Sequence, residues 1–241
     1  MELVHLAEVF AMKVRIKFRK YGVMKFIGHL DMMRYFQKAM RRASIPIAYS
    51  QGYSPHMIMS FANPLGVGLT SDGEYFDIEL VEAIPSEDAV KQLNEVMVEG
   101  VKIVSFVELP EGQKTGMSIV AAADYKVCLV TGEFTAEMQA QFHAFEQETT
   151  IQIVKKTKKS EREVDIRPLI YHMHMEKDCV RMQVATGSVE NLKPDLVMDA
   201  FFQYAGIEIE AMKFQYHREE VYAQDTTGKF VALDALGTEI Q

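Results

Sequence analysis

Hydrophobic and basic residues alternate strictly over Lys13–Arg19, near the start of the chain. Val14, Ile16 and Phe18 occupy one set of alternate positions, and four cations occupy the other. Successive side chains of a strand point to opposite faces of a sheet, so this pattern predicts a half-buried strand with a basic outer face. An internal methionine at position 12 precedes the strand, and residues 1–11 are expected to form an N-terminal extension.

A helix is predicted from His29 to Ala43, because apolar and basic residues both recur there at helical spacing. Pro46 ends the pattern, since proline cannot continue a helix. The expected core stripe consists of Leu30, Met33, Phe36, Met40 and Ala43. The expected basic stripe consists of Arg34, Lys38, Arg41 and Arg42.

The order of predicted elements is strand, helix, two strands, helix, strand, and it occurs twice. This order is that of the ferredoxin-like βαββαβ layout, with helices on one face of an antiparallel sheet. The sequence therefore predicts an α+β protein with two tandem ferredoxin-like domains. The expected divisions are a first domain at 12–109, a linker at 110–123, a second domain at 124–222 and a C-terminal tail at 223–241.

Composition places the chain among ordinary globular proteins, with 48% hydrophobic and 25% charged residues in 241 positions. No apolar run approaches the roughly 20 residues that span a bilayer, so no membrane association is expected. The two cysteines, Cys128 and Cys179, are too few for the ligand set of a radical iron–sulfur cluster or a structural zinc site. Low cysteine usage and the lack of a signal peptide predict a cytoplasmic protein.

Positive charge is concentrated in one segment of an acidic chain. The net charge is −8, yet Lys13–His56 contains ten Lys and Arg residues against one acid, Asp31. This asymmetry favours a surface built for an anion, although a solvated basic face without a partner remains the alternative. The anion-binding candidates are Arg15, Lys17, Arg19, Arg34, Lys38, Arg41 and Arg42, with Lys158 and Lys159 from a second basic cluster.

Histidines supply the candidates for chemistry. His29, Asp31 and His56 could converge for acid–base catalysis or metal binding if the turn around His56 folds over the start of the helix. The alternative is that His29 or Asp31 caps the helix and that His56 anchors its loop. His172 and His174 share one face of a predicted strand and could open a metal site with Cys179, or they could simply be exposed histidines on a sheet. Walker, Rossmann and nucleophile-elbow motifs are absent from the sequence, which favours a non-catalytic role.

Several short motifs resemble the uncharacterised bacterial radical SAM-linked, or radical SAM-associated, protein family. Most of the matching motifs lie between residue 12 and about residue 80, and the segment 162–168 also resembles the family. Gly28, where the family usually has Ser, and Tyr53-Ser54, where Phe-Asn is usual, depart from the pattern. The motifs are FIGHLD (26–31), Arg34, Arg41-Arg42, YSQGYSPH (49–56), SFA (60–62), PLGVG (64–68) and REVDIRP (162–168).

The resemblance implies a radical SAM protein as partner and no established activity for the family itself. No cofactor is expected on this chain, and the iron–sulfur cluster and S-adenosylmethionine are expected on the partner. Cations beside Tyr49 and Tyr53 also fit single-stranded RNA. The sequence therefore predicts a non-catalytic accessory or substrate-presenting subunit that binds RNA through a basic surface. The alternatives are a stand-alone RNA-binding or RNA-processing protein and a small hydrolase that uses His29, Asp31 and His56.

Overall fold

The protein was analysed as a computed structural model, which describes residues 12–156, 161–208 and 212–241. The expected N-terminal extension (1–11) and the cations Lys158 and Lys159 lie outside the described residues. Among the described residues, no helix is long and apolar enough to cross a membrane.

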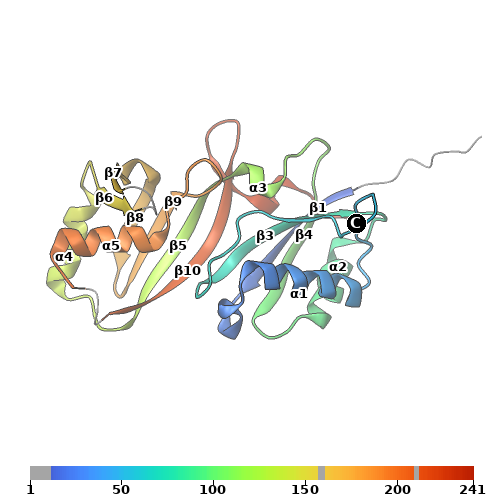
Figure 1. The fold of residues 1–241 in the computed structure, drawn as a ribbon, viewed down its shortest axis with the longest axis horizontal. Helices are drawn as coiled ribbons and strands as arrows, with labels where there is room; N and C mark the ends of the chain where they lie inside the picture. The colour runs from blue at the N-terminus through green and yellow to red at the C-terminus, as the bar shows by residue number, and fades with distance from the viewer. Residues whose placement is uncertain (1–11, 157–160, 209–211) are drawn as a thin grey trace, which may run out of the picture.

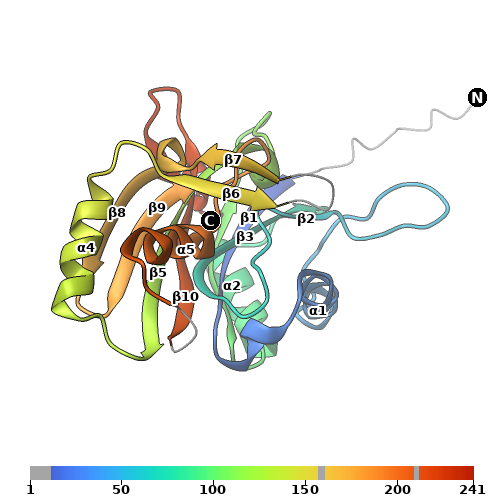
Figure 2. The same cartoon turned by 60° about the vertical axis from the view of Figure 1, so that its left-hand side comes forward.

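One large sheet runs through the whole molecule, with α1 and α2 packed against one end and α4 and α5 against the other (Figures 1 and 2). It has nine strands in the order β4-β1-β3-β10-β5-β9-β8, with β2 added to β3 and β11 added to β10. The pairing of β3 with β10 is parallel and all other pairs are antiparallel. The prediction of two separate ferredoxin-like domains with antiparallel sheets is therefore wrong, because β3 and β10 join both sets of strands into one mixed sheet.

The first half of the sheet is built from residues 12–108. As the alternation predicts, Val14, Ile16 and Phe18 of β1 are buried on the helix-covered face. Of the two strands expected after the first helix, the structure contains the short β2 and isolated bridges around Ile47 and Tyr49. The elements are β1 (Met12–Lys20), a 3₁₀ turn (Gly22–Phe26), α1 (His29–Arg42), β2 (Met59–Phe61), β3 (Thr70–Leu80), α2 (Ser86–Val96) and β4 (Val101–Glu108).

The second half follows a short helix, α3 (Gly116–Ile119), which lies within the expected linker. Its core is lined by aromatic side chains, with Phe142 and Phe145 of α4 packed on Phe201 of α5. The elements are β5 (Val120–Thr131), α4 (Ala136–Glu146), β6 (Gln152–Lys156), β7 (Glu161–Asp165), a 3₁₀ turn (Arg167–Leu169), β8 (Ile170–Glu176), β9 (Cys179–Ala185), α5 (Pro194–Ala205) and β10 (Lys213–Gln224).

The two cysteines form a disulfide between neighbouring strands of this half. Cys128 of β5 and Cys179 of β9 are direct partners in the strand register, and their sulfur atoms are 2.05 Å apart. Cys179 is therefore not a free thiolate for the metal site considered above.

The backbones of β3 and β10 approach each other closely where the two halves meet. A Cβ atom added to Gly73 of β3 would lie 2.8 Å from the Cα atom of Glu220 on β10. Real Cβ atoms do not come this close to backbone, so the join needs glycine at this position.

The C-terminal residues return to the first half and cover the face of the sheet opposite α1 and α2. They comprise β11 (Phe230–Ala232) and a 3₁₀ turn (Leu233–Leu236), and Thr238 forms a bridge with Glu108 of β4. Leu233 is completely buried there. This face was expected to be open, and the tail closes it over β1.

Candidate functional site

The basic face of β1 lies under the C-terminal tail. Arg15 is completely buried, and its guanidinium binds both carboxylate oxygens of Asp77 at 2.7 and 3.0 Å. It also donates to the backbone oxygen of Leu233 at 3.1 Å. The guanidinium is thus committed to structural contacts and cannot reach an anion in solvent.

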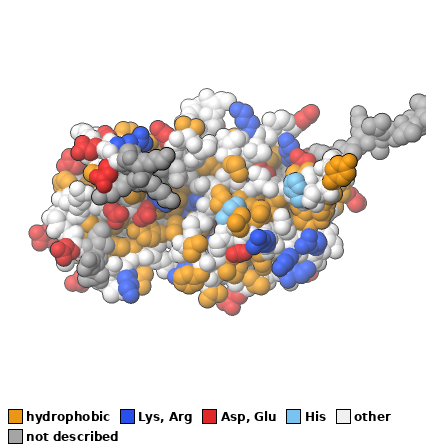
Figure 3. Space-filling view, in the orientation of Figure 1, with side chains coloured by type: hydrophobic (Ala, Val, Ile, Leu, Met, Phe, Trp, Pro, Cys, Tyr) orange, Lys and Arg blue, Asp and Glu red, His pale blue; other side chains and the backbone are white. Residues whose placement is uncertain are grey.

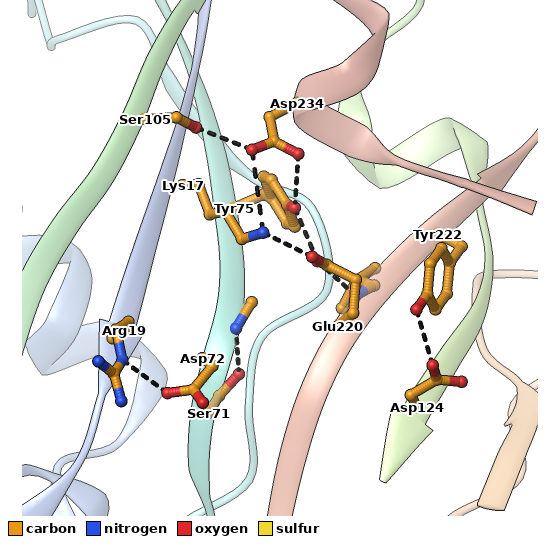
Figure 4. A network of polar contacts seen from close by, with 12 residues as sticks. Lys17, Arg19, Ser71, Asp72, Tyr75, Ser105, Asp124, Glu220, Tyr222 and Asp234 are labelled. Carbon is orange, nitrogen blue, oxygen red and sulfur yellow. Dashed lines mark hydrogen bonds and ion pairs between the residues drawn. The ribbon is translucent and has the colours of Figure 1, made fainter.

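Lys17 and Arg19 of the same strand are also paired with acids (Figure 4). Lys17 Nζ lies 2.5 Å from Glu220 Oε2 and 3.8 Å from Asp234 Oδ2. Arg19 binds Asp72 at 2.6 Å, in an ion pair that remains partly exposed. Arg15, Lys17 and Arg19 therefore do not form one continuous basic surface with the helix, because they face the opposite side of the sheet and are paired with acids.

Tyr75 of β3 ties the same network together (Figure 4). Its hydroxyl lies 2.7 Å from Glu220 Oε1 and 3.0 Å from Asp234 Oδ1, while Ser105 donates to Asp234 at 3.0 Å. Burial, and then the two nearby carboxylates, raise the pKa of Tyr75. The network links β1, β3, β4, β10 and the tail, and its role is to hold the tail on the sheet.

Helix α1 carries the exposed positive charge. Met32, Phe36, Ala39 and Met40 are its buried residues, so the core stripe is rotated from the expected one and Leu30 is 61% exposed. Gly28 is the N-cap residue, which leaves His29 and Asp31 inside the first turn. The exposed face carries Arg34, Lys38, Arg41 and Arg42.

The charged side chains of this helix form few hydrogen bonds and ion pairs within the described residues. Arg34 pairs with Asp31 at 3.3 Å, but both side chains are 68% exposed and the pair is weak in water. Arg42 donates to the backbone oxygen of Val96 at 2.7 Å. Within the described residues, Lys38 and Arg41 have no hydrogen-bond or ion-pair partner. Figure 3 shows the Lys and Arg side chains gathered over α1.

Exposed aromatic side chains occur in the segments before and after α1. Phe26 is 63% exposed, and the ammonium of Lys25 lies 5.2 Å from its ring centroid. Tyr53, in the long loop after α1, is fully exposed. Exposed rings thus occur on both segments that adjoin the basic helix in the chain.

The structure does not bring His29, Asp31 and His56 together. The His29 ring packs on Phe61 with centroids 5.2 Å apart, Asp31 pairs with Arg34, and His56 Nδ1 lies 2.8 Å from Ser50 Oγ. His56 is thus engaged with its own loop. No cluster of three or more potential metal ligands occurs in the described part of the chain.

His172 and His174 do share one face of β8, with ring centroids 5.0 Å apart. His174 Nε2 contacts Glu176 at 3.2 Å, and this glutamate also accepts from Arg181. The histidines, the acid and the arginine form a polar surface cluster rather than a set of metal ligands.

A cleft of about 580 Å³ separates the two halves on the helix-covered side of the sheet. The loop 63–69 forms one wall, and the segment 191–195 at the start of α5 forms the other. Tyr125, Phe214, Tyr216 and Arg218 complete the lining. Burial, and then Asp195 and Asp199, raise the pKa of Tyr216 to about 12, so its hydroxyl stays protonated at neutral pH.

The model of one protein family matches residues 13–194 of this chain. The matched segment includes α1, β3, nearly all of β1, and the walls of the cleft as far as Pro194. The chain belongs to DUF2344, a family of uncharacterised proteins conserved in bacteria. No curated protein matches the chain significantly. The DUF2344 description states no activity and no partner, so a radical SAM partner remains a proposal.

Sequence reasoning missed the cleft in this DUF2344 protein, because its walls come from segments more than 100 positions apart. One signal was present. The motif Pro64-Leu65-Gly66-Val67-Gly68, which carried part of the family resemblance, forms most of one wall. A loop that carries a family motif is a candidate for a binding surface, because binding residues often lie on loops.

Proposed function

We propose that this DUF2344 protein is a non-catalytic RNA-binding subunit that presents RNA to a radical SAM enzyme. The observation that carries the proposal is the exposed basic face of α1. Arg34, Lys38, Arg41 and Arg42 lie together on this helix, in a protein whose net charge is −8. A concentrated positive surface on an acidic protein directs a polyanion to that surface and repels it elsewhere.

The dimensions and the neighbouring side chains favour RNA over a small anion. From Arg34 to Arg42 the helix rises by about 12 Å, which is the length of several phosphates along a strand. Phe26 exposes its ring just before α1 in the chain, and Tyr49 and Tyr53 expose theirs in the segment that follows the helix. Unpaired bases stack on exposed rings while cations track the phosphates, which is how single-stranded RNA is commonly held.

The test is a salt titration of binding to a pool of short single-stranded RNAs. Replacing Lys38 and Arg41 by Ala removes two cations without described partners, so folding should be unaffected. We expect weaker binding across all sequences and a salt slope smaller by about 1.4, because each phosphate contact on single strands contributes about 0.7.

A charge-matched control uses Lys102→Ala with Lys229→Ala, two exposed cations of β4 and of the turn after β10. Binding by this variant should equal that of the wild type. If both double variants lose affinity equally, the effect is one of net charge and the α1 surface is not the site. Unchanged affinity in the α1 variant would reject the proposal.

The partnership with a radical SAM enzyme is supported by the motif resemblance over residues 12–80. Its test is affinity purification from the native cell, with identification of the co-purified protein and of its iron–sulfur absorbance. A partner with a radical SAM cysteine motif, recovered in stoichiometric amount, is the expected result. Recovery of RNA without such a partner would leave the chain as a stand-alone RNA-binding protein.

A further inference from the structure

The cleft between the halves has the size and shape of a binding site. Its volume of about 580 Å³ lies within the range of about 300–1,000 Å³ that is usual for ligand sites. Figure 3 shows the molecule hollowed between the two halves, on the face that also carries the cations of α1. The cleft and the basic surface therefore lie on the same face of the molecule.

Rings and free amides line the cleft. Tyr125, Phe214 and Tyr216 all contribute to the lining. Within the described residues, the side-chain amides of Asn63 and Asn191 make no hydrogen bond, although both border the cleft. Aromatic faces combined with unfilled amide donors and acceptors suit a planar ligand with hydrogen-bonding edges.

The charge of the cleft favours a neutral ligand. Arg218 at its base is 2% exposed and is neutralised by Glu74, at distances of 2.5 to 2.8 Å. Lys193 and Asp195, the other charged residues of the lining, carry opposite signs. No net positive charge remains in the cleft to attract a phosphate group. A nucleobase is uncharged and does not need such an attraction.

The wall of the cleft also contacts the 3₁₀ turn that precedes α1. Gly68 donates its backbone N–H to the oxygen of Lys25 at 2.8 Å. Arg218 donates to the backbone oxygen of Asn63 at 2.6 Å and so holds the other end of the same loop. The loop that forms this wall is therefore joined to the segment leading into α1, which places the cleft on the N-terminal side of the helix that carries the cations.

We propose that the cleft binds one unpaired base of the RNA whose backbone lies on α1. The inference rests on the proposed function and adds the substrate class of a second site. Tyr216 and its ring neighbours stack on the base, and Asn63 and Asn191 bond its edge. Base contacts of this kind add affinity that depends on the base and not on salt.

The test compares short single-stranded RNA with the same ribose–phosphate chain lacking bases. Tyr216→Ala and Asn191→Ala should each weaken RNA binding, with about a tenfold loss for the tyrosine. Neither change should alter the salt slope or the binding of the abasic chain. Asn191 is exposed, so its variant folds even if loss of the half-buried Tyr216 ring destabilises the protein. Tyr171→Ala, an exposed tyrosine of β8 outside both sites, is the matched control.

The outcomes separate this inference from the function on which it rests. If both cleft variants bind RNA as tightly as the wild type, the proposal that the cleft binds a base is wrong. Weaker binding by the α1 variant in the same experiment would still support the RNA-binding function. Equal losses for RNA and abasic chain, with a smaller salt slope, would make the cleft part of the phosphate track and also overturn it. If the wild type binds no RNA, the proposed function fails. Calorimetry with the four free nucleosides then tests whether the cleft binds a base. Nucleoside binding that both cleft variants lose supports the base site, and its absence rejects it.

Discussion

Arg218 of β10 binds Glu74 of β3 across the line where the two halves of the sheet meet. The guanidinium contacts both carboxylate oxygens, and both side chains are almost completely buried. Glu74 holds the pKa of Arg218 above its ordinary value against the opposing effect of burial. The ion pair therefore fixes the relation of the two halves at the base of the cleft.

Replacing Glu74 by Gln should lower the free energy of unfolding by about 3–5 kcal/mol, because it leaves the buried Arg218 charge without a counter-ion. Urea unfolding measures this directly. The double variant Glu74→Leu with Arg218→Met should recover much of the loss, since it removes both charges. Asp31→Asn, which breaks the exposed pair with Arg34, is the control and should cost less than about 1 kcal/mol. Equal costs for Glu74→Gln and Asp31→Asn would contradict the structural role.

Replacing Gly73 by Ala should destabilise the join between β3 and β10. The new methyl group would meet the backbone of Glu220, which cannot move away without breaking the strand register. We expect a loss of about 1–3 kcal/mol in thermal or urea unfolding. Gly66→Ala is the control, because its added Cβ would meet only Leu69 at an ordinary 3.7 Å. A Gly73 variant as stable as the Gly66 variant would show that the strands are less closely apposed than described.

Reduction of the Cys128–Cys179 disulfide should lower the free energy of unfolding by about 3–4 kcal/mol. The bond closes a loop between cysteines 51 positions apart, and it restricts the unfolded chain accordingly. Unfolding is measured with and without reductant, beside a variant carrying Cys128→Ser and Cys179→Ser. The double variant should match the reduced wild type and should not respond to reductant. A reductant effect of equal size in the variant would assign the change to something other than this bond.

Tyr216 should make stability fall between pH 10 and pH 12. Its pKa is raised from 10.0 to about 12 in the folded protein, chiefly by burial, so the unfolded chain loses this proton first. Deprotonation then favours the unfolded state across that interval, and below pH 10 the group contributes no pH dependence. Stability against pH is measured for the wild type and for Tyr216→Phe. The variant should lose less stability over this interval, and parallel curves would contradict the shift.

Local patterns in the sequence predict local structure here. Period-two alternation identifies β1 and its buried residues, and helical spacing identifies α1 and its exposed cations. Both signals depend on neighbours along the chain. They do not tell whether a second layer covers the polar face of a strand, and so Arg15, which is buried by residues 218 positions away, was predicted at the surface.

Long-range pairing explains the remaining differences. The parallel join of β3 and β10 consists of two register pairs, Thr70 with His217 and Ser71 with Arg218. A contact this short leaves no periodic pattern in the sequence of either strand. The candidate α1 surface could therefore be predicted from its own segment, but the cleft depends on the join and could not.

The late position of β10 in the chain has a consequence for synthesis on the ribosome. Thr70 and Ser71 of β3 pair with β10, and β10 begins only at Lys213. Until that strand emerges, β3 presents an unpaired edge, and the tail that buries Arg15 and Leu233 has not yet been made. Exposed strand edges in nascent chains invite pairing with other chains. A chain that stops before Lys213 would therefore keep this edge of β3 exposed and be prone to aggregation, and synthesis of β10 is the step that joins the two halves of the sheet.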